Sequence, residues 1–114
     1  MTDCLFCKIA NKEIPSSVVY EDEKVLAFKD INPEAPVHIL IIPKVHMDSA
    51  QDIRESNSSI MSHIFALIPK LAKDLGVDEK GFRVITNIGE HGGQTVKHLH
   101  FHMLGGRNLS WPPG

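Results

Sequence analysis

The feature that most constrains this chain is an alternation of residue types near its C-terminus, His98-Leu99-His100-Phe101-His102. Side chains of a β-strand alternate between its two faces, so the three histidines would share one face, about 7 Å apart between neighbours. The apolar residues between them would face the other way and need a covering layer. The pattern therefore predicts a strand with one core face and one face of three imidazoles.

Other periodic segments predict the elements that surround this strand. The apolar run Val37–Ile42 is typical of a central strand covered on both faces. Apolar residues three and four apart indicate a helix over 58–75, in which Pro69 predicts a kink or a division into two shorter helices. The full set of predicted elements is a short helix at 4–11, strands at 18–20, 25–28, 37–42, 82–87 and 96–104, and this long helix. Together they predict an α+β fold, a five-stranded antiparallel sheet with one long and one short helix.

Length and charge limit the classes of protein to which the chain can belong. Its 114 residues suit one domain, predicted to span 1–114 with a C-terminal tail at 105–114. The formal net charge of −2 argues against a broad nucleic-acid surface. No apolar run approaches the roughly 18 residues of a membrane span. We therefore expect a cytoplasmic protein with neither nucleic acid nor membrane as a partner.

Three imidazoles on one strand face allow three interpretations. The first is a solvated polar edge, the second is zinc ligation by alternate histidines, and the third is covalent catalysis on phosphorus. The loop Gly92-Gly93-Gln94-Thr95 directly precedes the strand and favours phosphorus. Its glycines let backbone N–H groups approach an anion, and its polar side chains are neutral donors. His38, within the apolar run, needs a polar partner of its own.

These residues resemble the histidine-triad (HIT) superfamily and, within it, the Hint branch of purine nucleoside phosphoramidases. The segment His98–Leu104 is similar to the signature His-apolar-His-apolar-His-apolar-apolar. Further similar motifs, in order, are Ile14-Pro15, Glu21-Asp22, Ala27-Phe28, Asp30-Ile31, Ala35-Pro36, His38, Ile42-Pro43-Lys44, Asn87, Gly92-Gly93-Gln94, Leu104-Gly105-Gly106-Arg107 and Trp111-Pro112-Pro113-Gly114. The resemblance implies a HIT-like fold in a homodimer, with the sheet continued from one subunit into the other.

The activity implied by the resemblance is hydrolysis of the P–N bond of purine nucleoside 5′-phosphoramidates, such as AMP linked to an amine. His100 would be the nucleophile on the α-phosphorus, forming a nucleotidyl-histidine, while His102 would bind the phosphate and help the amine leave. His98 and His38 would set the tautomer and orientation of His100. The implied phosphate contacts are Asn87, Gly93, Gln94, Thr95 and His102. The implied nucleoside contacts are Phe6, Ile9, Phe28, Asp30, Ile31, Leu40 and Trp111, the last reaching toward the partner subunit's site.

Two features depart from the phosphoramidase branch. Thr95 stands where serine is usual, which keeps the hydroxyl but restricts its rotamers. Cys4 and Cys7, three residues apart, suit a metal clip or a pair of thiols, and they are not general in this branch. Similarity to bacterial-type relatives implies a structural zinc held by Cys4, Cys7 and His46, with His98 completing the set. Catalysis itself would require no metal.

Two other functions remain open from the sequence. One is a dinucleoside polyphosphate hydrolase or nucleotidylyl transferase of the same superfamily. The other is a zinc-stabilised nucleotide-binding protein with little catalysis. A purine nucleotide is the expected ligand in each case, and the Trp111–Gly114 tail favours the phosphoramidase.

Overall fold

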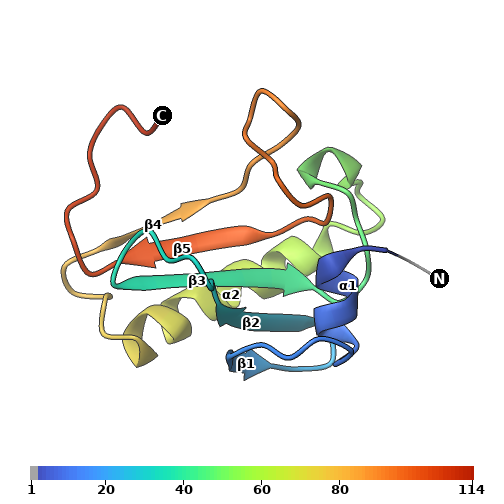
Figure 1. Ribbon diagram of the computed structural model, residues 1–114, viewed down its shortest axis with the longest axis horizontal. Helices are drawn as coiled ribbons and strands as arrows, with labels where there is room; N and C mark the ends of the chain where they lie inside the picture. Colours follow the sequence, from blue (N-terminus) through green and yellow to red (C-terminus); the bar gives the residue numbers. More distant parts are fainter. Residues whose placement is uncertain (1–2) are drawn as a thin grey trace.

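The computed structural model describes residues 3–114, so Met1 and Thr2 of the predicted 1–114 domain lie outside the described residues. Five strands form one sheet, and two α-helices pack against it (Figure 1). In chain order the elements are α1 (Leu5–Ala10), β1 (Val18–Glu21), β2 (Val25–Lys29), β3 (Val37–Pro43), the 3₁₀ helix η1 (Ala50–Asp52), α2 (Ser59–Asp74), β4 (Phe82–Ile85) and β5 (Phe101–Gly105). The predicted α+β class and strand number are confirmed, whereas η1 was not predicted.

The sheet has the strand order β1-β2-β3-β5-β4, and every neighbouring pair is antiparallel. β3 is the central strand, and His38 within it pairs with Leu104 of β5. Leu40, two residues along β3, pairs with His102. This register brings His38 and His102 to the same region of one sheet face, because both occupy alternating positions that point the same way.

Each face of the sheet has its own apolar core, as the apolar run of β3 predicted. On one face, Ile39 and Ile41 pack with the α2 residues Ile64, Ile68 and Leu71. On the other face, a smaller cluster packs against α1; its buried members are Phe6, Ile9, Ala10, Leu26, Phe28, Leu40 and Ile42. Leu99 and Phe101 belong to the α2 side, so the predicted division of the histidine segment into an apolar side and an imidazole side is confirmed.

The sequence predicted either a kink or a division at Pro69, and because α2 is one continuous helix, the division does not occur. Proline has no N–H to donate to the carbonyl of residue 65, four positions earlier. Both Pro69 and Phe65 lie on the exposed side of the helix, where water can hydrate that carbonyl. Because Pro69 is on the exposed side, the missing hydrogen bond costs little stability, and the helix continues through it. Gly76, with φ of 76°, follows the helix end.

The strand predicted over 96–104 is wrong in its first half, because β5 begins only at Phe101. Opposite its missing half lies Pro43, which has no N–H to donate to a strand ladder. Residues 98 and 99 instead form hydrogen bonds with the loop that follows β3. β4 likewise ends at Ile85 rather than Asn87. Within residues 3–114, no helix combines the length and hydropathy that crossing a membrane requires.

Candidate active site and metal centre

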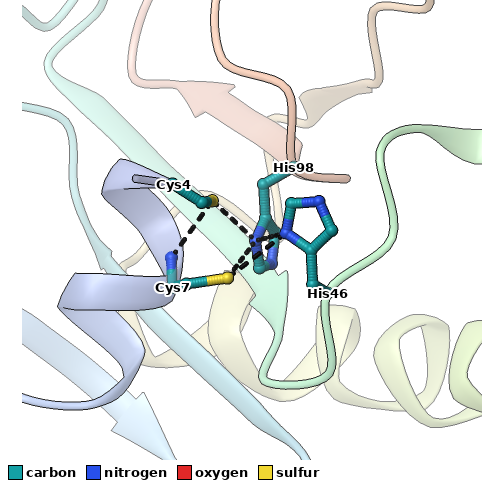
Figure 2. Close-up of side chains that lie close together, drawn as sticks. All are labelled: Cys4, Cys7, His46 and His98. Carbon is teal, nitrogen blue, oxygen red and sulfur yellow. Dashed lines mark hydrogen bonds between the residues drawn. The ribbon is translucent and has the colours of Figure 1, made fainter. Parts of the chain in front are cut away.

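Two cysteines and two histidines from three separate segments form a compact cluster. Cys4 and Cys7 come from the start of α1, His46 from the loop after β3, and His98 from the segment before β5 (Figure 2). Their ligand atoms all lie within 4.8 Å of one another. The predicted set of candidate zinc ligands therefore does come together in the fold.

Both histidines of this cluster turn Nδ1 toward the thiols. Nε2 of His98 donates to the carbonyl of Pro43 at 2.9 Å, and Nε2 of His46 donates to the Asp48 carboxylate at 2.7 Å. A neutral imidazole has one proton, so each Nδ1 carries a lone pair. Hydrogen-bonded partners of this kind fix the tautomer of metal-binding histidines in general. The cluster thus offers two nitrogen lone pairs and two sulfurs to a common centre.

The spacing of these atoms fits zinc. The Nδ1 atoms of His46 and His98 are 3.2 Å apart, and Cys–His S–N distances are 3.2–3.5 Å. A tetrahedral zinc with ordinary bond lengths places its ligand atoms about 3.3–3.8 Å from one another. Two nitrogen lone pairs facing each other at 3.2 Å would repel without a shared cation. The donor set and its geometry therefore make this a candidate structural zinc site.

His100 is buried and has its tautomer fixed by the main chain. Its Nδ1 donates to the carbonyl oxygen of His98 at 2.7 Å, so the lone pair belongs to Nε2. The ring of Phe6 meets it edge-on at a centroid distance of 5.0 Å. His98 thus orients His100 through its backbone carbonyl, while its imidazole belongs to the metal cluster.

His38 and His102 form a second hydrogen-bonded unit. The backbone N–H of Glu34 donates to Nδ1 of His38 at 3.0 Å, which places the His38 proton on Nε2. That Nε2 donates to Nδ1 of His102 at 2.9 Å and lies 3.4 Å from the Asp30 carboxylate. His38 therefore sets the tautomer of His102, with its proton on Nε2, and contacts this ring instead of the expected His100.

Burial lowers the pKa of His102 to about 4 from its ordinary value of 6.5, with smaller contributions from the nearby His100 and His38. The negative charge of Asp30 acts in the opposite direction but is outweighed. His102 is therefore neutral at neutral pH. Asp30, His38 and His102 also group closely enough for a metal, yet the His38 proton on Nε2 occupies the atom that would have to ligate. The three residues are better described as a hydrogen-bonded chain.

A pocket of about 320 Å³ opens beside His100 and His102. Its apolar walls include Phe6 and Ile9 of α1 and Phe28 and Leu40 of the sheet. Its full lining is Leu5, Phe6, Ile9, Ile14, Pro15, Ser16, Phe28, Lys29, Asp30, Ile31, Asn32, Leu40, Thr95, Val96, His100 and His102. A larger hollow of about 720 Å³ lies between 76–81 and 106–108, but its lining contains no histidine or cysteine. The smaller pocket is the candidate active site because His100 and His102 line it.

Comparison with known proteins agrees with this geometry. The HIT domain family matches residues 11–109 of the chain. The chain belongs to the HIT domain family. A HIT family hydrolase from Legionella pneumophila Philadelphia 1 is 49% identical with a TM-score of 0.96, the match covering 98% of this chain and 100% of that one.

Two further relatives cover nearly all of this HIT domain. A histidine triad protein from Clostridium difficile is 58% identical with a TM-score of 0.93, and the match covers 96% of both chains. The "14 kDa zinc-binding protein" of Zea mays is 51% identical over 112 residues, which are 96% of this chain and 87% of the relative. The fold prediction from the resemblance therefore holds at the level of the family.

Some of the remaining predicted site residues of this HIT domain line the pocket, and others lie outside its lining. Six of the seven expected nucleoside contacts line it, and Thr95 lies at its edge. Gly93 and Gln94 line a neighbouring hollow with Thr95, and the Asn87 amide donates to the carbonyl of Gly92. Trp111 is 80% exposed in the C-terminal tail, outside the pocket lining.

Two contributions to the site were missed from the sequence. Asp48 accepts the Nε2 proton of His46, and its position two residues after His46 was the available signal. The Pro43 and His98 carbonyls fix the tautomers of His98 and His100. Every residue has a backbone carbonyl, so no sequence pattern could have shown that these two act as acceptors.

Proposed function

We propose that this HIT domain hydrolyses purine nucleoside 5′-phosphoramidates, such as AMP joined to an amine, through a nucleotidyl-histidine formed on His100. The observation that carries the proposal is the hydrogen bond from Nδ1 of His100 to the His98 carbonyl, at 2.7 Å. It leaves the Nε2 lone pair of a buried imidazole available beside a pocket. The names of similar proteins, HIT family hydrolases from Legionella pneumophila and Clostridium thermocellum, favour a hydrolase.

In the first step, Nε2 of His100 attacks the α-phosphorus, and the P–N bond to the amine breaks. The amine takes up one proton as it leaves. The Nε2–H of the neutral His102 donates a hydrogen bond to the leaving nitrogen, and solvent supplies the proton, because Nδ1 of His102 already accepts from His38. The products of this step are the free amine and nucleotidyl-His100.

In the second step, water attacks the phosphorus and the bond between phosphorus and Nε2 of His100 breaks. The attacking water gives its proton to solvent, while the Nε2–H of His102 binds a phosphate oxygen. The nucleoside monophosphate then leaves. Each residue ends the cycle in the state in which it entered, and no metal takes part in either step.

The pocket suits a nucleoside. Phe6, Ile9, Phe28, Ile31 and Leu40 provide an apolar wall for the purine, and Asp30 would accept hydrogen bonds from the ribose hydroxyls. Thr95, Asn87, Gly93 and His102 remain the proposed phosphate contacts, whereas both amide protons of Gln94, expected to bind phosphate, have protein acceptors.

The proposal extends to a zinc ion and a second subunit. Zinc bound by Cys4, Cys7, His46 and His98 would have a structural role, since all four positions of its tetrahedron are taken by the chain. A homodimer would continue the sheet and bring Trp111 toward the partner subunit's pocket, in a cytoplasmic enzyme. Sedimentation of a dimer, together with a raised KM in Trp111→Ala, would be the expected result.

The test is a comparison of two histidine variants with an AMP-amine substrate. His100→Asn removes the nucleophile and should abolish turnover, with the sheet and metal content intact. His91→Asn changes an exposed histidine outside the pocket and should retain the wild-type rate. Wild-type turnover by the His100→Asn protein would refute the proposal. Faster cleavage of diadenosine polyphosphates than of the phosphoramidate would instead favour the dinucleoside hydrolase, and binding without turnover would favour a nucleotide-binding protein.

A further inference from the structure

The segment from Gln94 to His100 carries the proposed nucleophile, yet no strand ladder holds it. Three hydrogen bonds attach it to residues 43–48, which comprise the last residue of β3 and the loop that follows, and are called the loop of residues 43–48 below. They run from Nε2 of Gln94 to the Asp48 carbonyl at 2.6 Å, from Nε2 of His98 to the Pro43 carbonyl at 2.9 Å, and from the Leu99 N–H to the Met47 carbonyl at 2.6 Å. The position of His100 therefore depends on the position of this loop.

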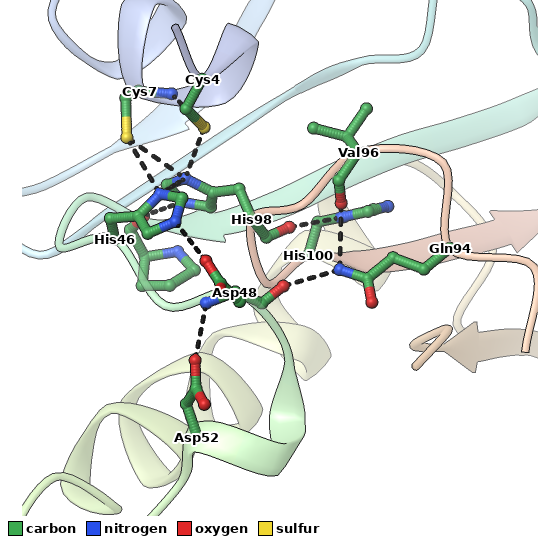
Figure 3. A network of polar contacts seen from close by, with 10 residues as sticks. Cys4, Cys7, His46, Asp48, Asp52, Gln94, Val96, His98 and His100 are labelled. Carbon is green, nitrogen blue, oxygen red and sulfur yellow. Dashed lines mark hydrogen bonds and ion pairs between the residues drawn. The ribbon is translucent and has the colours of Figure 1, made fainter. Parts of the chain in front are cut away.

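The loop is in turn held at His46 and Asp48. His46 lies in the metal cluster and donates from Nε2 to the Asp48 carboxylate at 2.7 Å (Figure 3). The N–H of Asp48 donates to the Asp52 carboxylate at 2.9 Å. Asp48 thus has contacts in three directions: its side chain to the cluster, its N–H to η1, and its carbonyl to Gln94.

The Gln94 amide is fully engaged in joining the two loops. Its Nε2 donates to the carbonyls of Asp48 and Val96, at 2.6 and 3.0 Å, and its Oε1 accepts from the N–H of Gly89 at 3.0 Å. An amide nitrogen has two protons, and both have protein acceptors here. Gln94 could bind a phosphate oxygen only by giving up one of these bonds.

We infer that Asp48 and Gln94 are positioning residues, which connect the metal cluster to the segment 94–100 and so hold His100 in its attacking position. The connection has two routes. One runs from the cluster through the His98 imidazole to the His98 carbonyl, which binds Nδ1 of His100. The other runs through His46, Asp48 and Gln94. That Asp48 and Gln94 fix the segment 94–100 follows from the hydrogen bonds alone. That this positions His100 for attack on phosphorus rests on the proposed function.

Two variants interrupt the second route without touching a metal ligand. Gln94→Glu keeps the shape but replaces two donors by a carboxylate that faces two carbonyl oxygens. Gln51→Glu is the matched control, because the same change falls on an exposed glutamine whose side chain forms no hydrogen bond with the described residues. Asp48→Ala removes the acceptor of the His46 proton, and Asp48→Asn restores an acceptor oxygen at the same place.

The experiment measures amide hydrogen exchange, zinc content and kinetics on the zinc-loaded proteins. In Gln94→Glu and Asp48→Ala we expect the Leu99 amide to exchange about tenfold faster or more, with β3 amides unchanged. We also expect kcat to fall about 10–100-fold, with a smaller change in KM, as is typical of residues that orient a ligand. Asp48→Asn should recover most of the loss, and Gln51→Glu should match wild type.

Two results would overturn the inference. In the first, the Leu99 amide and kcat are unchanged in both variants. In the second, exchange rises equally throughout the sheet, which would mean general destabilisation. If no protein, wild type included, hydrolyses the phosphoramidate while the Leu99 amide still responds, the proposed function fails and the positioning of the segment stands.

Discussion

At the scale of single residues, the three alternating histidines have three different partners. The His98 imidazole faces the cysteines, His100 bonds to a backbone carbonyl, and His102 bonds to His38. The alternation predicted that they would gather on one side of the segment. It could not predict their tautomers, because the groups that fix them are main-chain atoms and a histidine 64 positions away. The structure therefore gives each histidine a different partner, whereas the alternation indicated only that the three lie close together.

The pKa of His102 leads to a prediction about pH. Burial lowers this pKa to about 4, below the ordinary histidine value of 6.5, so the folded protein binds fewer protons than the unfolded chain between these values. Stability should therefore fall as pH drops from about 6.5 toward 4. Urea unfolding at several pH values should show a weaker pH dependence in His102→Asn than in wild type. An equal dependence in both proteins, or an NMR titration of His102 near pH 6.5, would contradict the assignment.

At the scale of elements, the main correction concerns where strands and helices end. β3, α1 and the apolar stripe of α2 could be predicted, because each has a periodic apolar pattern that a core requires. β5 was predicted too long because residues 98–100 keep the alternation of a strand while bonding to a loop. The division of α2 at Pro69 was predicted because the sequence alone does not show which side of the helix meets water.

The turn between β1 and β2 is joined to α2 by the Asp22 carboxylate. It accepts hydrogen bonds from the N–H groups of Lys24 and Val25, from the Tyr20 hydroxyl and from His63 of α2. Burial raises the pKa of Asp22, but these bonds outweigh it and hold the pKa well below the ordinary aspartate value of 3.8. The contact between the β1–β2 turn and α2 is therefore strongest when the Asp22 carboxylate is ionised.

We expect Asp22→Ala to lower the free energy of unfolding by about 1–3 kcal/mol at pH 7, the range for losing hydrogen bonds to a charged group. Because the folded-state pKa is lowered, this stabilisation is present above about pH 4 and is lost as the pH falls below it. Denaturant unfolding at pH 7 and pH 3 measures the difference. Asp74→Ala, on the exposed end of α2, is the control and should change little. A pH-independent loss in Asp22→Ala would contradict this explanation.

At the scale of the whole molecule, the metal cluster joins segments that are far apart in the chain. It brings α1, the loop of residues 43–48 and the segment before β5 to one place. α1 has only six residues, too few to be stable as an isolated helix. Its Phe6 and Ile9 form part of the pocket wall, so we expect the metal to stabilise the site as well as the fold.

Removal of zinc should therefore destabilise the protein. We expect a chelator to lower the Tm of the wild-type protein by several degrees, since a ligand that binds only the folded state stabilises it. Cys7→Ser should start at the lower Tm and respond little to the same chelator. Thermal unfolding with metal analysis provides the measurement. A wild-type Tm that is insensitive to chelation, in protein shown to have lost its zinc, would contradict a structural role.

The candidate site could be predicted to a similar extent as the fold. The four metal-cluster residues and most of the pocket lining came from motifs and the resemblance. The routes that connect them did not, because they pass through backbone carbonyls of 43, 48 and 98 and through the Gln94 amide. Such contacts depend on how two loops meet, which no local pattern of residue types records.

The central claim is that His100 forms a covalent bond to the substrate phosphorus. The most direct test is rapid chemical quench of the protein with an AMP-amine substrate, followed by mass spectrometry of its peptides. The account predicts a single adenylylated residue, His100, that appears within the first turnover and is absent from His100→Asn. Adenylylation of another residue, or product release with no labelled peptide at any quench time, would contradict it.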